Sequence, residues 1–267
     1  MTTSEENNAP IGFFDSGVGG LSVLKEVKKL LPNENYLYYG DTVHVPYGEK
    51  TKEQLISYSK NILKFFYQNG CKAVVMACNT TSSTVYNDIK NLYGFKLYPI
   101  VQSVAKVLSL LDVERLGIFA TKSTINSHAY PNEISKFNSK IKVYGQYCPD
   151  WAGFVEKNII NEPQSIEVIK SDLDKMLKNK PDKIVLGCTH YPYLLPVLSE
   201  FAPENLFIDP AKPFAKYIAD DLKSSKLLST STKSGNEEFY VSSNPQQFKK
   251  AAKMFYPIDK EVRLLRF

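Results

Sequence analysis

A strand that leads directly into a helix is indicated by Lys72-Ala-Val-Val-Met-Ala-Cys-Asn-Thr-Thr81. Residues 74–77 form a short, continuous apolar run, which is typical of a parallel strand covered on both faces. The small hydroxyl and amide residues at 79–82 are of the types that begin helices. We therefore expect the thiol of Cys78 at the carboxyl end of a strand, where open α/β sheets bind their ligands.

A second stretch, Lys183-Ile-Val-Leu-Gly-Cys-Thr-His190, repeats this pattern and places Cys188 after its apolar run. The segments that begin at Gly12 and Gly117 also resemble each other, since both are apolar runs that end in a polar turn. The offsets are 117 − 12 = 105 and 188 − 78 = 110 residues, so we infer two related halves. A single buried cysteine is often structural. Two in matched contexts favour a shared cleft to which each half contributes one thiol.

Strand and helix patterns alternate along the chain, which predicts two doubly wound α/β domains with mostly parallel sheets. We place residues 1–98 and 210–267 in the first domain, on the Cys78 side, and residues 99–209 in the second, on the Cys188 side. Residues 97–101 are expected to form a strand that leads into the second domain, and residues 206–208 to return the chain to the first. Other expected features are a disordered tail over 1–9, a capping box at Thr51–Gln54, and closing helices over 213–222 and 244–255.

Length and composition narrow the function classes. The chain has 267 residues, 43% of them hydrophobic, as in a soluble globular protein with two modest domains. Its net charge of +5 comes from scattered lysines without a basic arm, which gives little support to nucleic-acid binding. A polar N-terminus and the lack of a long apolar run predict neither a signal peptide nor a membrane span.

The four cysteines, Cys71, Cys78, Cys148 and Cys188, show no metal-ligand spacing, so we predict a reduced, cytoplasmic protein without a metal site. Cys71 and Cys148 are expected to be structural. The turn at residues 17–20 is rich in glycine, but Ser22 stands where a dinucleotide fingerprint would need glycine, so a nicotinamide or flavin cofactor is not supported. The glycines instead allow backbone N–H groups to approach an anion closely.

Four motifs, in this order along the chain, resemble those of bacterial glutamate racemases of the aspartate/glutamate racemase superfamily. They are Phe14-Asp-Ser-Gly-Val-Gly-Gly20, Gly40-Asp-Thr with Val45-Pro-Tyr-Gly48, Ala77-Cys-Asn-Thr80 and Gly187-Cys-Thr-His-Tyr-Pro192, with a weaker match at Ala120-Thr-Lys-Ser-Thr124. The resemblance implies a cofactor-independent isomerase that interconverts L- and D-glutamate for peptidoglycan synthesis. It also implies two pseudo-twofold-related domains and assembly as a homodimer.

The resemblance assigns roles to individual residues. Cys78 and Cys188 would be the two acid/base residues, with Asp15 and His190 also in catalysis and Glu156 assisting near the second thiol. The substrate site would comprise Asp15, Ser16, Pro46, Tyr47, Gly48, Asn79, Thr80, Thr121, Thr189 and His190. Three segments depart from the family pattern and bear on Glu156 and on local pocket shape: Gln102-Ser103, Ala152-Gly-Phe-Val-Glu156 and Thr81.

Two thiols suit the chemistry of racemisation. One base removes the proton from one face of the carbon and a second group returns a proton to the opposite face, so one thiolate and one thiol are needed at a time and titrate together. A thiol has an ordinary pKa of about 8.5, and the helix N-termini and hydroxyl donors after each cysteine are expected to favour the thiolate. Asn79, Thr80 and Thr189 could hold the α-carboxylate as charge builds on it. Asp15 could pair with the substrate ammonium, orient a thiol or cap the helix that follows it.

Three alternatives remain open. An aspartate racemase, or another cofactor-free racemase, would use the same chemistry on a different substrate. A one-cysteine decarboxylase of the superfamily is disfavoured because both motifs retain cysteine. A two-lobed binding protein would close on an amino acid without chemistry, but it has no need for thiols on both sides of its cleft.

Overall fold

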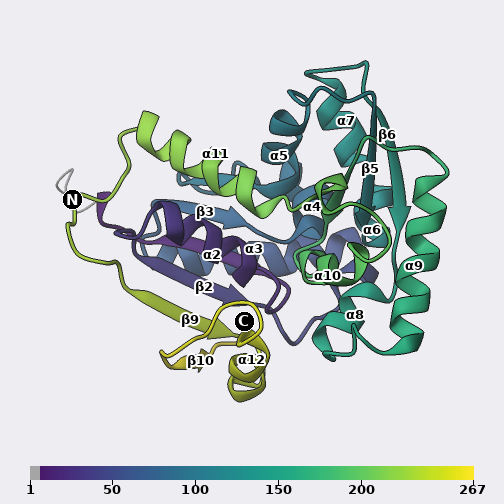
Figure 1. The fold of residues 1–267 in the computed structure, drawn as a ribbon. Coiled ribbons are helices and arrows are strands. Elements are labelled where there is room, and N and C mark those ends of the chain that lie inside the picture. The colour runs from purple at the N-terminus through teal and green to yellow at the C-terminus, as the bar shows by residue number, and fades with distance from the viewer. Residues whose placement is uncertain (1–6) are drawn as a thin grey trace.

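The structure, a computed structural model, describes residues 7–267 (Figure 1). Within these residues, ten strands form two entirely parallel sheets. The first sheet has the order β10-β9-β2-β1-β3-β4 and the second β6-β5-β7-β8. Figure 1 shows the first sheet at the left and the second at the right, so the predicted α/β class with two parallel sheets is confirmed.

The first sheet takes strands from both ends of the chain. Its strands are β1 (Ile11–Asp15), β2 (Tyr36–Gly40), β3 (Ala73–Met76), β4 (Lys96–Pro99), β9 (Glu237–Val241) and β10 (Val262–Leu264). The second sheet takes its strands from the middle: β5 (Arg115–Ala120), β6 (Lys142–Tyr147), β7 (Lys183–Gly187) and β8 (Phe207–Ile208). The first sheet thus uses segments from both ends of the chain and the second uses the middle, as predicted for the two halves. The exact domain boundaries stay a prediction.

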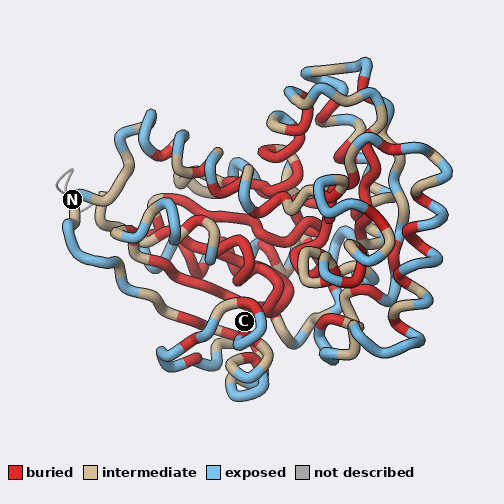
Figure 2. Tube along the Cα trace, in the orientation of Figure 1, coloured by how far each residue is buried: buried red, intermediate tan, exposed pale blue. Residues whose placement is uncertain are grey.

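Helices cover both faces of the first sheet because its strands are apolar on both sides. Phe13 and Val75 point into the core beneath α2 (Leu21–Leu30) and α11 (Ala211–Ser224), which pack against each other. Phe14 and Met76, one residue further along, point into a second core shared with α3 (Lys52–Gln68) and α4 (Asn79–Ile89). Figure 2 shows the resulting buried strands at the centre of this half.

Most of the remaining helices surround the second sheet or join it to the first, whereas the last of them packs against β9 and β10 of the first sheet (Figure 1). They are α5 (Ile100–Leu108), α6 (Lys122–Asn126), α7 (Ala129–Ser135), α8 (Trp151–Glu156), α9 (Pro163–Leu177), α10 (Leu195–Leu198) and α12 (Pro245–Ala252). Short 3-10 turns lie at η1 (Tyr47–Glu49), η2 (Tyr191–Leu194) and η3 (Glu204–Leu206). The core beneath α2 continues without a break through α5 and into the second sheet, so the two halves share one hydrophobic core.

Several local predictions are confirmed and others are wrong. The capping box is present, since the Thr51 hydroxyl accepts from the Gln54 amide at 3.3 Å and the Gln54 side chain accepts from the Thr51 amide at 3.0 Å. The strand predicted over 97–101 ends at Pro99, where α5 takes over. Residues 207–208 form β8, which pairs with β7 at the edge of the second sheet, and the chain then continues into α11, which packs against α2 of the first half. Strands β9 and β10 were not predicted.

The predicted disordered tail lies outside the described residues up to position 6. Beyond it, Asn8 is fixed by hydrogen bonds, because its carbonyl accepts from Asn35 and its side-chain oxygen accepts from the Ser229 hydroxyl, both at 2.8 Å. No helix within residues 7–267 is long and apolar enough to cross a membrane.

Candidate active site

A cavity of about 450 Å³ lies between the two halves. Its walls are the segments that follow β1, β2 and β3 in the first sheet and β5, β6 and β7 in the second. Carboxyl ends of parallel strands are where α/β proteins place their ligands. All predicted site residues except Asp15 line it: Ser16, Pro46, Tyr47, Gly48, Cys78, Asn79, Thr80, Thr121, Glu156, Cys188, Thr189 and His190.

The two predicted catalytic thiols reach the cavity from different sheets. Cys78 follows β3 and is the residue that precedes the first turn of α4. Cys188 follows β7 and precedes η2. Both are largely buried, with 6% of Cys78 and 8% of Cys188 exposed. One cavity therefore contains one thiol from each half, as the repeated sequence pattern predicts.

The surroundings of Cys78 do not favour its thiolate, contrary to expectation. Burial raises the pKa of Cys78 to about 12, and the nearby negative charge of Asp15 adds to this effect. Hydrogen bonds from Thr81 act in the opposite direction but are outweighed. The helix terminus alone does not offset the loss of solvation, so Cys78 is a protonated thiol at neutral pH.

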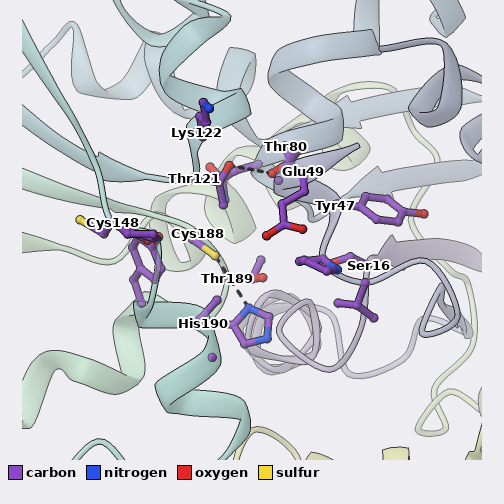
Figure 3. A pocket seen from close by; sticks show the side chains of 18 of the residues that line it. Ser16, Tyr47, Glu49, Thr80, Thr121, Lys122, Cys148, Cys188, Thr189 and His190 are labelled. Atoms are coloured by element: carbon purple, nitrogen blue, oxygen red, sulfur yellow. Dashed lines mark hydrogen bonds between the residues drawn. The ribbon is translucent and has the colours of Figure 1, made fainter. Parts of the chain in front are cut away.

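Cys188 has a different neighbour. Its Sγ lies 3.8 Å from Nδ1 of His190, as the dashed line in Figure 3 marks. Nε2 of the same ring lies 3.2 Å from Oε1 of Glu156. Burial by itself would lower the pKa of His190, but Cys188 and Glu156 outweigh it and raise the pKa to about 10. A protonated imidazole next to the sulfur stabilises negative charge there.

Glu156 is in the place that the sequence predicts, near the second thiol. It ends α8 and lines the cavity beside His190. Burial opposes ionisation of Glu156, but its contact with His190 prevails and lowers the pKa of the carboxyl. Glu156, His190 and Cys188 thus form a row of three ionisable groups that leads from the mouth of the cavity to the thiol.

Asp15 lies behind the cavity wall and is fully buried. Its Oδ2 accepts from the backbone amides of Gly17 at 3.2 Å and Gly20 at 3.0 Å, and its Oδ1 lies 3.5 Å from the Thr189 hydroxyl. The glycine-rich turn therefore wraps around the carboxylate of Asp15, which is the anion that its amides approach. Burial raises the pKa of Asp15, although His190 and these amides oppose the rise. This position favours a capping and orienting role.

Hydrogen-bond donors line the wall beside Cys78. Asn79 is 3% exposed, and its Nδ2 has no hydrogen-bond partner within residues 7–267. Thr80, from α4, and Thr121, from the start of α6, place their hydroxyl oxygens 2.9 Å apart across the boundary between the halves. A carboxylate in the cavity would therefore find an uncommitted amide and two hydroxyl groups.

The loop that carries Pro46, Tyr47 and Gly48 closes another side. Figure 3 shows the ring of Tyr47 turned away from the cavity, and its hydroxyl donates to Asp41. The Ser123 hydroxyl donates to the Gly48 carbonyl at 2.6 Å, which ties this loop to α6 of the other half. Tyr47 is therefore a lining residue whose ring points away from the cavity (Figure 3), with its hydroxyl anchoring the loop.

Other residues of the cavity were not predicted. Several of them are next to a predicted residue in the sequence, and this adjacency is the signal that could have found them. Glu49 follows Gly48, and Lys122 follows Thr121. Cys148, predicted to be only structural, directly follows β6 and also lines the cavity, although burial raises the pKa of its thiol. The full set of additional lining residues is Val45, Glu49, Lys122, Tyr147, Cys148, Pro149, Ala152, Gly153, Lys157 and Tyr191.

Within the described chain, no group of three or more His, Cys, Asp or Glu side chains has the arrangement of a metal site.

One position of the glycine-rich turn requires glycine for a steric reason. A Cβ on Gly19 would lie 2.3 Å from the Thr189 hydroxyl and 2.7 Å from the His190 ring. Gly19 is thus needed for the close approach of the Cys188 segment.

The chain is similar over almost its whole length to proteins of known sequence and structure. The family described as Asp/Glu/Hydantoin racemase matches residues 13–217. A glutamate racemase of Thermoanaerobacter sp. (strain X514) is 38% identical over 92% of each chain, and one of Carboxydothermus hydrogenoformans is 36% identical over 95% of each. The structure of a Francisella tularensis glutamate racemase in complex with D-glutamate superposes with a TM-score of 0.90 at 29% identity, covering 97% of this chain and 98% of that one. A Thermus thermophilus glutamate racemase in complex with beta-chloro-D-alanine gives 0.86 at 30% identity over 98% of both.

Proposed function

Because the chain belongs to the Asp/Glu/Hydantoin racemase family, and is thus an isomerase of the amino-acid racemase class, we propose that it interconverts L- and D-glutamate. The observation that carries the proposal is the meeting of Cys78 and Cys188, one from each sheet, in a single cavity lined with carboxylate-binding groups. The relatives named glutamate racemase and the D-glutamate complex support glutamate as the substrate.

The two thiols divide the reaction between them. One thiolate takes the α-proton, and the electron pair of the broken C–H bond is delocalised into the α-carboxylate. The thiol on the opposite face gives its proton to the same carbon and becomes the thiolate. Each turnover thus moves one proton onto one sulfur and one proton off the other, and the reverse direction exchanges their roles.

The resting enzyme starts from an unequal pair. The His190 imidazolium lies 3.8 Å from the Cys188 sulfur, whereas burial and the nearby charge of Asp15 raise the pKa of Cys78. Cys188 therefore acts first as the base and Cys78 as the acid, and the opposite enantiomer requires the proton to be redistributed between them. Glu156 maintains the charge on His190 from the far side of the ring.

The barrier falls because charge on the carboxylate is stabilised as it forms. The Nδ2 group of Asn79 and the hydroxyls of Thr80 and Thr189 provide donors in a buried site, where such bonds are strong and already oriented. Removal of one such donor from an enzyme typically costs about 10²–10³ in kcat. These groups do the work of an electron sink, so we propose that the reaction needs no metal or organic cofactor.

Further proposals follow from the family. We propose that the enzyme is a cytoplasmic homodimer that supplies D-glutamate for peptidoglycan synthesis. Neither a membrane nor a nucleic acid is a partner in this proposal, and the ligand is a small amino acid.

The substrate is tested by incubating the enzyme separately with L- and D-glutamate and with L- and D-aspartate, followed by chiral chromatography. We expect either enantiomer of glutamate to reach an equal mixture, with aspartate at least about 100-fold slower, because the loss of one methylene shortens the distance between the two carboxylates of the substrate. Faster turnover of aspartate would replace the substrate and keep the mechanism. Binding of glutamate without turnover would favour the two-lobed binding protein.

A further inference from the structure

The side-chain amide of Asn79 has two possible orientations with opposite consequences. With Nδ2 toward the cavity it donates to a substrate carboxylate, and with Oδ1 toward the cavity it repels one. Its position at the start of α4, directly after Cys78, fixes where the amide lies but not which of its two polar atoms faces the substrate. Some other group must select the productive orientation.

Tyr130 makes the contact that distinguishes the two. It lies in α7 of the second half, is 2% exposed, and donates its hydroxyl proton to Oδ1 of Asn79 at 2.8 Å. Nδ2, on the other side of the amide, is left without a partner in the described chain. The oxygen of the amide is thus held by the protein and the nitrogen is left for a ligand.

Rotation of the amide by 180° would be unfavourable. Nδ2 could donate to the phenol oxygen, but the hydroxyl proton of Tyr130 would then lack its acceptor, since Asn79 is the only one it has within residues 7–267. A buried donor without an acceptor is costly. Burial also raises the pKa of Tyr130, so the phenol keeps this proton.

We propose that Tyr130 is a positioning residue for the reaction: its hydroxyl fixes the Asn79 amide so that Nδ2 donates to a carboxylate of the substrate. Tyr130 belongs to the second half and Asn79 to the first, so the amide is oriented only when the two halves are packed together. The inference rests on the proposed racemase function, because it assigns to Asn79 the task of binding a substrate carboxylate.

The test combines Tyr130→Phe with Asn79→Ala in a double-mutant cycle, with L- and D-glutamate as substrates. Tyr130→Phe removes only the hydroxyl, and we expect kcat/KM to fall about tenfold, as for the loss of one buried hydrogen bond. In the Asn79→Ala background the same change should alter kcat/KM less than about twofold, because the group that it orients is already gone.

Tyr36→Phe is the matched control. Tyr36 is equally buried and donates its hydroxyl to the Leu31 carbonyl at 2.6 Å, in a part of the first half that does not line the cavity. This control should retain wild-type kcat/KM. An equal effect of Tyr130→Phe with and without Asn79, or no effect at all, would overturn the inference.

A second readout separates a change in the Asn79 amide from a general loss of stability in Tyr130→Phe. The side-chain NH₂ signals of Asn79, identified by their absence in Asn79→Ala, are expected in one sharp set in the wild type and to shift or broaden in Tyr130→Phe. Unchanged signals would also overturn the inference. If wild-type enzyme exchanges no α-proton of glutamate, the proposed function itself fails and the inference falls with it.

Discussion

Cys78 and Cys188 have the same chemical group at equivalent positions of two related halves, yet their neighbours differ. The sulfur of Cys188 lies next to His190, which in turn contacts Glu156, whereas Cys78 is close to the buried carboxylate of Asp15. A thiolate is stabilised by nearby positive charge and disfavoured by burial beside negative charge. The difference between the two thiols is therefore electrostatic and should be visible as a difference in reactivity.

We predict that iodoacetamide alkylates Cys188 at least about tenfold faster than Cys78 at pH 7.5, because the thiolate is the nucleophile. A thiol with a raised pKa ionises only as the pH rises, so the rate at Cys78 should increase about tenfold per pH unit toward its pKa of about 12. Peptide mass spectrometry gives both rates, and His190→Asn should slow labelling at Cys188 alone. Faster labelling of Cys78 at neutral pH would contradict this assignment.

Among single residues, the motifs predicted the cavity well because its residues follow strand ends that the apolar runs already indicate. Asp15 shows what sequence could not provide. The family resemblance placed it in the substrate site and the glycine turn also allowed a capping role, but whether a carboxylate faces a cavity or its own backbone amides depends on the path of the turn. The raised pKa of Cys78 was missed for a similar reason, since burial is a property of the whole packed structure.

At the scale of elements, the start of α2 and the glycine-rich turn before it pack against the Cys188 segment. The Ser22 hydroxyl donates to the Thr189 carbonyl at 3.4 Å, and Gly19 leaves room for the Thr189 and His190 side chains. The glycine-rich turn thus joins the two halves beside the second thiol. Two glycines of this turn, Gly17 and Gly19, should therefore respond differently to substitution by alanine.

Gly19→Ala should destabilise the protein by about 1–3 kcal/mol and lower kcat/KM by more than tenfold, because the added methyl would overlap Thr189 and displace His190. Gly17→Ala is the control, since no heavy atom of the described chain, apart from Gly17 and its two neighbours, lies within 4 Å of the methyl it would add. Its stability should stay within about 0.5 kcal/mol of wild type. Urea unfolding and the racemisation assay measure both, and equal behaviour of the two variants would refute the steric explanation.

The elements that sequence failed to predict have physical reasons. β9 begins with Glu237-Glu238, so its apolar alternation is hidden, and β10 has only three residues, Val262–Leu264. Residues 97–101 read as one apolar run, but Pro99 separates a strand from a helix with the same composition.

At the scale of the whole molecule, two sheets share one core. The buried cluster that includes Phe13 and Val75 of the first sheet continues to Ile118 and Leu186 of the second. Hydrogen bonds between Thr80 and Thr121, and between Ser123 and Gly48, add contacts across the cavity. Such continuity predicts that the halves unfold together although each has its own sheet.

We therefore expect a single transition in urea. Trp151, the only tryptophan, is buried against Phe119 and Tyr191 in the second half, so its fluorescence reports on that half. Far-UV circular dichroism reports on both halves. The two curves should share one midpoint and one slope, and glutamate should shift both to higher urea equally. A fluorescence transition that is separate from the circular dichroism transition would show that the halves unfold independently.

The most direct test of the two-thiol account follows the α-proton of L- and D-glutamate by proton NMR in D₂O, with wild type, Cys78→Ser and Cys188→Ser. We predict that wild type replaces the α-proton by deuterium as it forms the opposite enantiomer, because proton removal and return use different groups. Each serine variant should racemise at least about 10²-fold more slowly, as expected for the loss of an acid/base group. Racemisation at the wild-type rate by either variant, or inversion that retains the original proton, would contradict a reaction shared between Cys78 and Cys188.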